Sequence, residues 1–212
     1  MNIQIIKHPL IEHKLASLRN ERCHMPKFRK LLNEIGLLMT FEVTKHLETV
    51  DIMIETPVAN AKGKKLKKDP VLVTILRAGI GMLEPFMQLL PNSRVGFLGM
   101  SRDEETLEPH SYYSKIPSQA LDSPVLLIDP MLATGGSALS AIDFLKNKGL
   151  KDISFVCLVA APEGVKVLNE KHPDIKIYTA ALDEKLNEKG YIVPGLGDAG
   201  DRIFGTGDDG DL

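Results

Sequence analysis

One stretch in the second half of the chain decides its fold class: Val125-Leu126-Leu127-Ile128-Asp129-Pro130-Met131-Leu132-Ala133-Thr134-Gly135-Gly136-Ser137. It begins with a continuous apolar run, which is typical of a strand buried on both faces. A turn of small and hydroxyl-bearing residues follows, and residues 137–148 then have the pattern of a helix. A strand, a glycine-rich turn and a helix in this order are the repeating unit of α/β proteins.

Similar units occur on both sides of this stretch. Apolar runs that predict strands lie at residues 71–76, 94–100, 125–128, 153–159 and 175–179, after an alternating strand at 50–54. Helical patterns cover residues 10–19, 26–43, 82–90, 137–148 and 163–171. We therefore expect an α/β fold in which a parallel sheet is flanked by helices and binds ligands at the carboxyl ends of its strands. No linker divides the chain, so residues 1–212 are expected to form a single domain with a mobile acidic tail at about 207–212.

The composition limits the class of protein. Of 212 residues, 43% are hydrophobic, which is enough to bury a core. The 26 basic and 28 acidic side chains give a net charge of −2, which argues against a dedicated nucleic-acid binder. The sequence has neither an apolar run of about 18 residues nor a secretory signal. We expect a cytoplasmic protein with no membrane or nucleic-acid partner.

The turn after Ile128 has the features of a phosphate site. Unpaired N–H groups and the positive end of the helix dipole meet at the start of the following helix. Gly135 and Gly136 allow close approach of the backbone, while Thr134 and Ser137 supply hydroxyl donors. Asp129 would repel a phosphate and is better suited to accept hydrogen bonds from sugar hydroxyls. The turn therefore predicts a ribose 5-phosphate site; the alternative is an ordinary helix capped by Ser137.

Two arginines follow neighbouring predicted strands. Arg77 comes directly after the apolar run 71–76, and Arg102 comes shortly after the run 94–100. A guanidinium presents a planar fork of donors to phosphate oxygens and keeps its charge at any working pH. Two of them at adjacent strand ends would suit a diphosphate, although each could also be a solvated surface charge. The polar segment 101–120 that follows has the length of a loop that closes over a site, or of a surface hairpin.

Several motifs, in order, resemble the uracil phosphoribosyltransferase family of type I phosphoribosyltransferases. Asp129-Pro130-Met131-Leu132-Ala133-Thr134-Gly135-Gly136-Ser137 is similar to that family's motif for 5-phosphoribosyl 1-diphosphate (PRPP), where most type I enzymes carry two adjacent acids. Further matches are His8-Pro9-Leu10 and the segments 75–79, 99–109, 160–164 and 190–201. They span nearly the whole chain. Ser101 departs from the family, which often has an aromatic residue there, so no role is assigned to it.

The resemblance implies transfer of the 5-phosphoribosyl group from PRPP to N1 of uracil, giving UMP and diphosphate in pyrimidine salvage. It implies catalytic roles for Arg77, Arg102 and Asp198. PRPP would be bound by these three residues and by Asp129, Pro130, Met131, Leu132, Ala133, Thr134, Gly135, Gly136 and Ser137. Uracil would be bound by Ile192, Gly197, Asp198 and Ala199, in a segment (190–210) that holds seven of the 17 glycines.

The same resemblance implies further features of the enzyme. Magnesium would arrive bound to PRPP, with Asp198 as a ligand through water, rather than in a cage of protein ligands. The terminal segments would form a hood over the site, and residues 101–120 would be a flexible lid. A homodimer or higher homo-oligomer is implied, and activation by GTP, as in some relatives, is left open.

Three alternatives remain at this stage. The first is a non-catalytic RNA-binding regulator on the same fold. The net charge of −2 and the presence of a single lysine cluster, between residues 62 and 68, argue against it, and a solvated turn explains that cluster. The second is a transferase that uses another base. The third is a nicotinamide-dependent oxidoreductase, but the Gly-x-Gly-x-x-Gly matches at 195–200 and 205–210 lack the strand, helix and later acid that this fingerprint requires.

Overall fold

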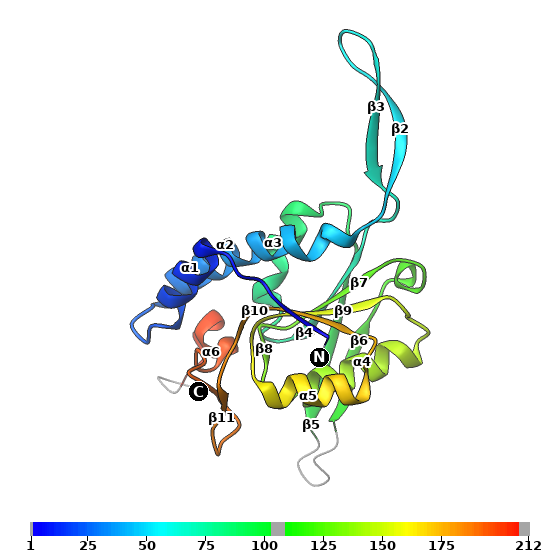
Figure 1. Ribbon diagram of the computed structural model, residues 1–212. Coiled ribbons are helices and arrows are strands. Elements are labelled where there is room, and N and C mark those ends of the chain that lie inside the picture. The colour runs from blue at the N-terminus through cyan, green and yellow to red at the C-terminus, as the bar shows by residue number, and fades with distance from the viewer. Residues whose placement is uncertain (1, 103–108, 208–212) are drawn as a thin grey trace.

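The computed structural model describes residues 2–102 and 109–207, with side chains for residues 2–100 and 112–207. A mixed sheet has the strand order β1-β10-β9-β7-β4-β5-β6, with β8 paired to β9 (Figure 1). Its strands are β1 (Ile3–Ile5), β4 (Val71–Leu76), β5 (Val95–Arg102), β6 (Pro109–Lys115), β7 (Val125–Ile128), β8 (Met131–Leu132), β9 (Ile153–Ala160) and β10 (Lys176–Leu182). The pairings are parallel except that of β5 with β6. The first strand of the chain pairs with a late one, with Ile3 opposite Ile177.

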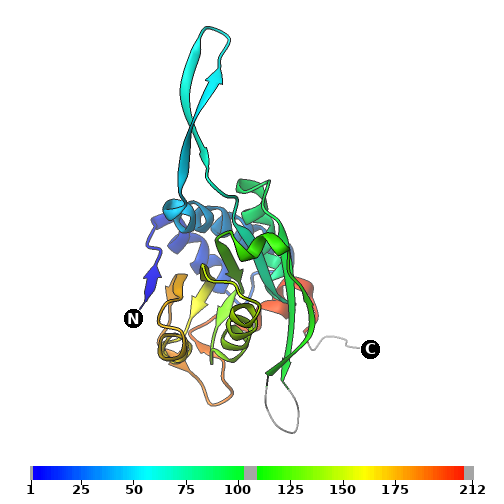
Figure 2. The same ribbon diagram turned by 90° about the vertical axis from the view of Figure 1, so that its right-hand side faces the viewer.

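Helices cover both faces of this sheet (Figures 1 and 2). They are α1 (Pro9–Arg19), α2 (Met25–Val43), α3 (Ile80–Leu89), α4 (Gly136–Asn147), α5 (Pro162–Lys171) and α6 (Ala199–Phe204). Successive strand residues point to opposite faces, so Leu126 packs with α1, α2, α3 and α6, whereas Leu127 packs with α4 and α5. The apolar runs in the sequence are continuous because both faces of each central strand are buried. None of the helices in the described ranges has the length and apolarity needed to cross a membrane.

The two terminal segments meet above the sheet, as expected for a hood. Arg29 of α2 donates from Nε to the carbonyl of Ile203 in α6 at 2.6 Å. Arg202 of α6 donates from Nη2 to the carbonyl of Asn20 at 2.7 Å, and its guanidinium lies 4.5 Å from the centre of the Phe28 ring. The helix α6 was not predicted, because its glycine-rich surroundings in the sequence indicated a loop.

A two-stranded arm projects from the body of the protein (Figures 1 and 2). It consists of β2 (Thr49–Glu55) and β3 (Asn60–Leu66), paired antiparallel and separated by a short turn. The lysine-rich segment 62–68 was expected to be a turn, and that expectation was wrong, because most of it forms β3. Opposite charges across and beside the ribbon favour the pairing: Lys64 contacts Asp51 at 2.8 Å, and Lys67 contacts Glu48 at 2.7 Å.

In the segment 101–120 the structure shows antiparallel strand pairing, as in the surface hairpin that was the alternative to a loop. Pro109–Lys115 of this segment form β6, which pairs antiparallel with β5, and Ser118–Leu121 forms a 3₁₀ turn (η2). Tyr112 and Tyr113 favour a strand, and Gly99 of β5 leaves room for the Tyr112 ring that lies against it. Residues 103–108 lie outside the described residues, as does the acidic tail from 208, so the lid and the mobile tail stay predictions.

Candidate active site

The predicted phosphate turn lies at the carboxyl edge of the sheet, between β7 and α4. Asp129 continues β7, with its N–H donating to the carbonyl of Val156 at 3.1 Å, and β8 holds the next residues against β9. Gly135 has φ +84°, a left-handed conformation that favours glycine, and α4 begins at the next residue. A cavity of about 190 Å³ is lined by Asp129, residues 131–137 and Ala138. The structure thus brings together in one hollow most of the residues predicted to bind ribose phosphate.

The N-cap residue of α4 contributes no side-chain hydrogen bond to the start of the helix. Its N-cap residue is Gly135, so the alternative in which Ser137 merely caps an ordinary helix does not apply. The hydroxyl of Thr134 accepts a hydrogen bond from the N–H of Gly136 at 3.4 Å, and both Thr134 and Ser137 are exposed. An uncapped helix start beside a cavity is a favourable site for an anion.

Gly135 serves the turn in a way that sequence reasoning missed. A Cβ at this position would lie 3.2 Å from the carbonyl oxygen of Gly164 and 3.3 Å from its Cα. Gly164, in the first turn of α5, packs in turn against the carbonyl of Ala133, where a Cβ would collide. The two glycines therefore let α5 support the turn closely from behind, in addition to allowing a ligand to approach.

Asp129 has an unusual protonation equilibrium. Burial is the main cause that raises the pKa of its carboxyl from 3.8 to about 7; a hydrogen bond from the N–H of Met131 opposes the rise, and the negative charge of Asp198 adds to it. The side chain is only partly exposed and lines the cavity. Near neutral pH both protonation states of the carboxyl are therefore populated, and in either state an oxygen can accept a hydrogen bond from a ligand hydroxyl.

The loop that carries Arg77 lies next to this turn, because β4 and β7 are parallel neighbours with Thr74 opposite Ile128. A Cβ on Gly79 would lie 2.7 Å from the carbonyl oxygen of Ile128, so only glycine allows the two loops to pack this closely. The Arg77 side chain is 64% exposed, and its Nη2 lies 3.9 Å from Oδ1 of Asp201. The backbone of Arg102 ends β5, the next strand along the sheet, and its side chain lies outside the described part.

The predicted base-binding segment lies close to both the Arg77 loop and the predicted phosphate turn. A Cβ on Gly200 would lie 3.8 Å from Cβ of Ala78, and one on Gly190 would lie 3.8 Å from Cγ2 of Thr134. Asp198 is the N-cap of α6 and accepts the N–H of Asp201 at 2.9 Å. The side chains of Ile192 and Ala199 are buried, so any contact they make with a base is through the backbone.

Two charged side chains that contact this segment have no motif in the sequence. Arg19 and Asp183 form an ion pair at 2.6 Å and both bind the backbone of Gly195. They lie 164 residues apart in the chain. Only the folded structure brings them together, and no spacing pattern could have indicated them.

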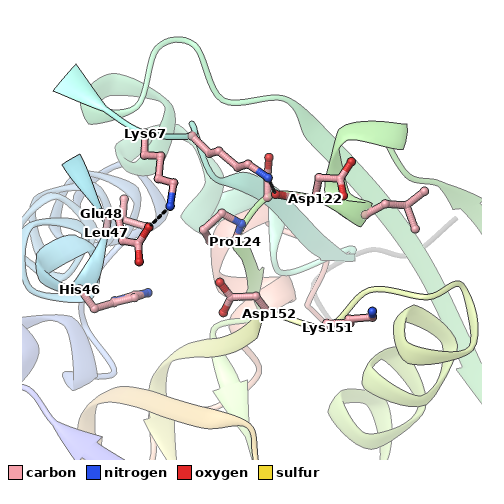
Figure 3. Close-up of a pocket in the computed structure, with 11 residues that line it drawn as sticks. His46, Leu47, Glu48, Lys67, Asp122, Pro124, Lys151 and Asp152 are labelled. Carbon is pink, nitrogen blue, oxygen red and sulfur yellow. Dashed lines mark hydrogen bonds and ion pairs between the residues drawn. The ribbon is translucent and has the colours of Figure 1, made fainter. Parts of the chain in front are cut away.

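A larger cavity, of about 430 Å³, lies at the opposite edge of the sheet, where the strands begin (Figure 3). Pro124 and Asp152, which precede β7 and β9, contribute to its wall. Its charged groups include the Glu48–Lys67 ion pair, and Lys68 donates to the carbonyl of Asp122. Ligands of parallel α/β sheets bind at the carboxyl ends of the strands, so this cavity is not the candidate active site.

Comparison with known proteins agrees with this geometry. A family model described as uracil phosphoribosyltransferase matches residues 5–206. Two uracil phosphoribosyltransferases are similar to this chain. That of Levilactobacillus brevis is 58% identical over 204 residues, which cover 96% of this chain and 98% of the relative. That of Streptococcus uberis is 59% identical over 204 residues, with the same coverage. A solved protein structure from Aquifex aeolicus has a TM-score of 0.88 at 42% identity, covering 96% of this chain and 98% of that one.

A more distant structure shares the fold alone: adenine phosphoribosyltransferase of Trypanosoma brucei, with a TM-score of 0.60 at 13% identity, covering 93% of this chain and 88% of that one. Both have a mostly parallel sheet with helices on both faces. Together with the family match, this fold and the glycine-rich turn after β7 place the chain in the class of phosphoribosyltransferases. The family model and the much more similar bacterial relatives identify the family within this class. The chain belongs to the uracil phosphoribosyltransferase family.

Proposed function

We propose that this protein transfers the 5-phosphoribosyl group of PRPP to N1 of uracil, giving UMP and diphosphate. The observation that carries the proposal is the uncapped start of α4 in a cavity beside Asp129, at the carboxyl edge of a parallel sheet. Backbone N–H groups from Gly135 to Ser137 bind the 5-phosphate, and Asp129 accepts hydrogen bonds from the ribose hydroxyls. Family membership supplies the identity of the base.

The departing diphosphate is stabilised by positive charge. Arg77 is exposed beside the phosphate turn, and Arg102 ends the neighbouring strand. As the bond from C1 to the diphosphate oxygen breaks, negative charge grows on the leaving group and positive charge on the ribosyl carbon. Fixed cations at the leaving group, with uracil held on the opposite face of the sugar, lower the barrier by charge complementarity and positioning.

Uracil is recognised by the backbone of Ile192 and of Gly197, Asp198 and Ala199. Uracil offers an N–H flanked by two carbonyl oxygens, and main-chain amides and carbonyls complement that pattern. Gly197 has φ +78°, so the chain there takes a path that other residues rarely follow. Cytosine reverses part of the pattern, and each mismatched buried polar pair costs about 1–3 kcal/mol.

Magnesium is expected to enter with PRPP. Among the described residues, no group of three His, Cys, Asp or Glu side chains is placed to hold an ion. The carboxylates of Asp129 and Asp198 are near enough for the charge of one to act on the other, so a cation carried by the substrate would relieve their repulsion. Bound Mg²⁺ would neutralise charge on the diphosphate, and Asp198 would reach it through water, in keeping with the preference of Mg²⁺ for retained waters and phosphate oxygens.

The function is tested by incubating the protein with PRPP, Mg²⁺ and each common pyrimidine or purine base separately, and identifying the nucleoside monophosphate formed. We expect UMP from uracil and no product from cytosine or the purines. Product from another base would assign a sibling activity instead. RNA binding that weakens steeply with salt, without any product, would favour a regulator. The same assay with added GTP tests the activator that the resemblance left open.

We also propose that the protein forms a homodimer through the arm β2–β3. Val50, Ile52 and Ile54 alternate along β2, and the last two face Gly63 and Ala61, which are too small to cover them. Ile54 is 42% exposed. A two-stranded ribbon is marginally stable alone in water, so an apolar face of this kind is best explained by contact with a second copy.

Replacing Ile54 by lysine is expected to shift the native mass from a multiple of the 23.4 kDa chain to the single chain, because a charge would be buried in the contact. Light scattering after size exclusion at micromolar concentration measures this. The matched control is Lys64→Gln, which alters the exposed Lys64–Asp51 pair of the same arm and should leave the mass unchanged. A wild-type protein with the mass of one chain would contradict the proposal.

A further inference from the structure

The base-binding segment is held from beneath by one ion pair. Gly195 precedes Gly197 by two residues, in the loop between β12 (Ile192–Val193) and α6. Oδ2 of Asp183 accepts the N–H of Gly195 at 2.9 Å, and Nη1 of Arg19 donates to its carbonyl oxygen at 2.6 Å. Both polar backbone atoms of Gly195 are therefore bound by the same two side chains, which we name the Arg19–Asp183 clamp.

The clamp itself is rigid. Arg19 donates from Nη1 to Oδ2 of Asp183 at 2.7 Å and from Nη2 to Oδ1 at 2.6 Å, a two-pronged contact between charged groups. The two side chains are 20% and 5% exposed. Asp183 directly follows β10, and its N–H donates to the carbonyl of Ala160 at the end of β9 at 2.8 Å. The clamp thus ties Gly195 both to the sheet and to the last residue of α1.

Only glycine fits at position 195, so the residue has no side chain that could fix its backbone by packing. Its φ is +60°, and a Cβ at this position would collide with the carbonyl of Ile192. The next carbonyl, of Leu196, accepts a hydrogen bond from Nη1 of Arg202 at 2.8 Å. With residues 195 and 196 both bound to arginines, the chain enters Gly197 and Asp198 from a fixed starting point.

We propose that Arg19 is a positioning residue for base recognition, acting through Asp183 on Gly195 and so on the amides of residues 197–199. This inference rests on the proposed function. Recognition by backbone groups depends on their exact placement more than recognition by long side chains does, because a peptide cannot change rotamer to recover a lost contact. Displacement of a binding group by about 1 Å can cost about 100-fold in activity.

The test uses the full-length protein with Arg19→Lys, which keeps a positive charge beside the buried carboxylate of Asp183 but loses the planar fork. We expect the KM for uracil, from steady-state kinetics, and the Kd for UMP, from calorimetry, each to rise about tenfold. This is the effect expected when one hydrogen bond to a charged group is lost. The Kd for ribose 5-phosphate, which lacks the base, should change less than twofold. A purely structural role would not separate the two ligands.

The matched control is Lys14→Gln. Lys14 also lies on α1 and joins it to another element, through an ion pair with Glu34 at 2.6 Å, but this pair has no contact with the base-binding segment. We expect both dissociation constants to stay unchanged.

Asp183→Asn tests the clamp from its other side. Asparagine still accepts the N–H of Gly195 but loses the charge, so affinity for UMP should fall at least threefold while affinity for ribose 5-phosphate is kept.

Equal weakening of UMP and ribose 5-phosphate in Arg19→Lys and Asp183→Asn, or unchanged UMP binding in both, would overturn the clamp. These outcomes are separate from failure of the proposed function. A wild-type protein that makes no UMP from uracil and PRPP contradicts that function, whereas an active wild type with unselective variants contradicts the clamp alone.

Discussion

Replacing Arg77 by alanine is expected to lower kcat by about 10²–10³, the loss seen when one donor to a developing negative charge is removed. The side chain is 64% exposed, on a loop that lies next to the turn 129–137, so little folding energy depends on it. Its only partner among the described ion pairs is Asp201 at 3.9 Å, which is a weak contact. Steady-state kinetics at saturating PRPP measure the effect, and the melting temperature should stay within about 2 °C of wild type.

Arg94→Ala is the control for that substitution. Arg94 is also exposed and lies beside β5, but at the edge of the sheet where the strands begin, far from the phosphate turn. Turnover should be unaffected. Arg77→Lys should recover part of the lost activity, because the charge remains while the fork is lost. If Arg77→Ala turned over at the wild-type rate, the diphosphate would have to be stabilised elsewhere.

Replacing Asp129 by asparagine is expected to have two opposite effects. Affinity for PRPP should fall about 10–100-fold, because one carboxyl oxygen that accepts from the ribose hydroxyls is replaced by an NH2 group that cannot accept. Without ligand, the Asp129→Asn variant should be more stable than the wild type at alkaline pH. The pKa of Asp129 is about 7 when folded and 3.8 when unfolded, so the stabilisation that the protonated carboxyl provides is fully present below pH 4 and is lost as the pH rises through 7.

The neutral amide does not titrate, so the two proteins should melt together at pH 4 and diverge as the pH rises. A shift of this size corresponds to at most about 4 kcal/mol, so Asp129→Asn should melt several degrees above wild type at pH 8. Melting curves from pH 4 to 8 measure this. Asp152→Asn, a change in an exposed carboxylate at the opposite edge, should leave the curve unaltered. A constant difference between Asp129→Asn and wild type at every pH would contradict burial as the cause.

The central strands and the helices could be predicted from the sequence because burial controls them. The apolar runs 71–76 and 125–128 coincide with β4 and β7, and the helix predicted over 137–148 begins and ends within one residue of α4. The two strands are apolar along their length because helices cover both faces of the sheet, and the helix is apolar on the side that packs against the sheet. The hydrophobic pattern therefore carries the information that places them.

The first strand of the arm was predicted at residues 50–54, but its partner β3 was not, and the pattern did not decide between a loop and a hairpin for the segment 101–120. Lys62, Lys64 and Lys65 lie in β3 because of pairing with β2 and not because of their own strand preference, which is low. In the same way, β6 forms against the open edge of β5. Strand pairing between polar segments leaves little trace in the pattern of apolar residues.

The candidate site divides along similar lines. The turn from Asp129 to Ser137 and Arg77 were predicted, because a local motif and a strand end mark them, and the structure brings them together. Arg19 and Asp183 were missed, because their pairing depends on how α1 lies against the end of β10. Local chemistry can be predicted from sequence, but contacts made by the tertiary fold cannot.

The pairing of β1 with β10 has a consequence for how the chain acquires its shape. Ile3 lies opposite Ile177, so β1 has no partner in this sheet until β10, about 174 residues further along the chain, has been made. Contacts between such distant segments slow folding and leave apolar edges uncovered for longer. Chains truncated before residue 176 should therefore be sensitive to protease at β1, and chains that include β10 should be resistant there.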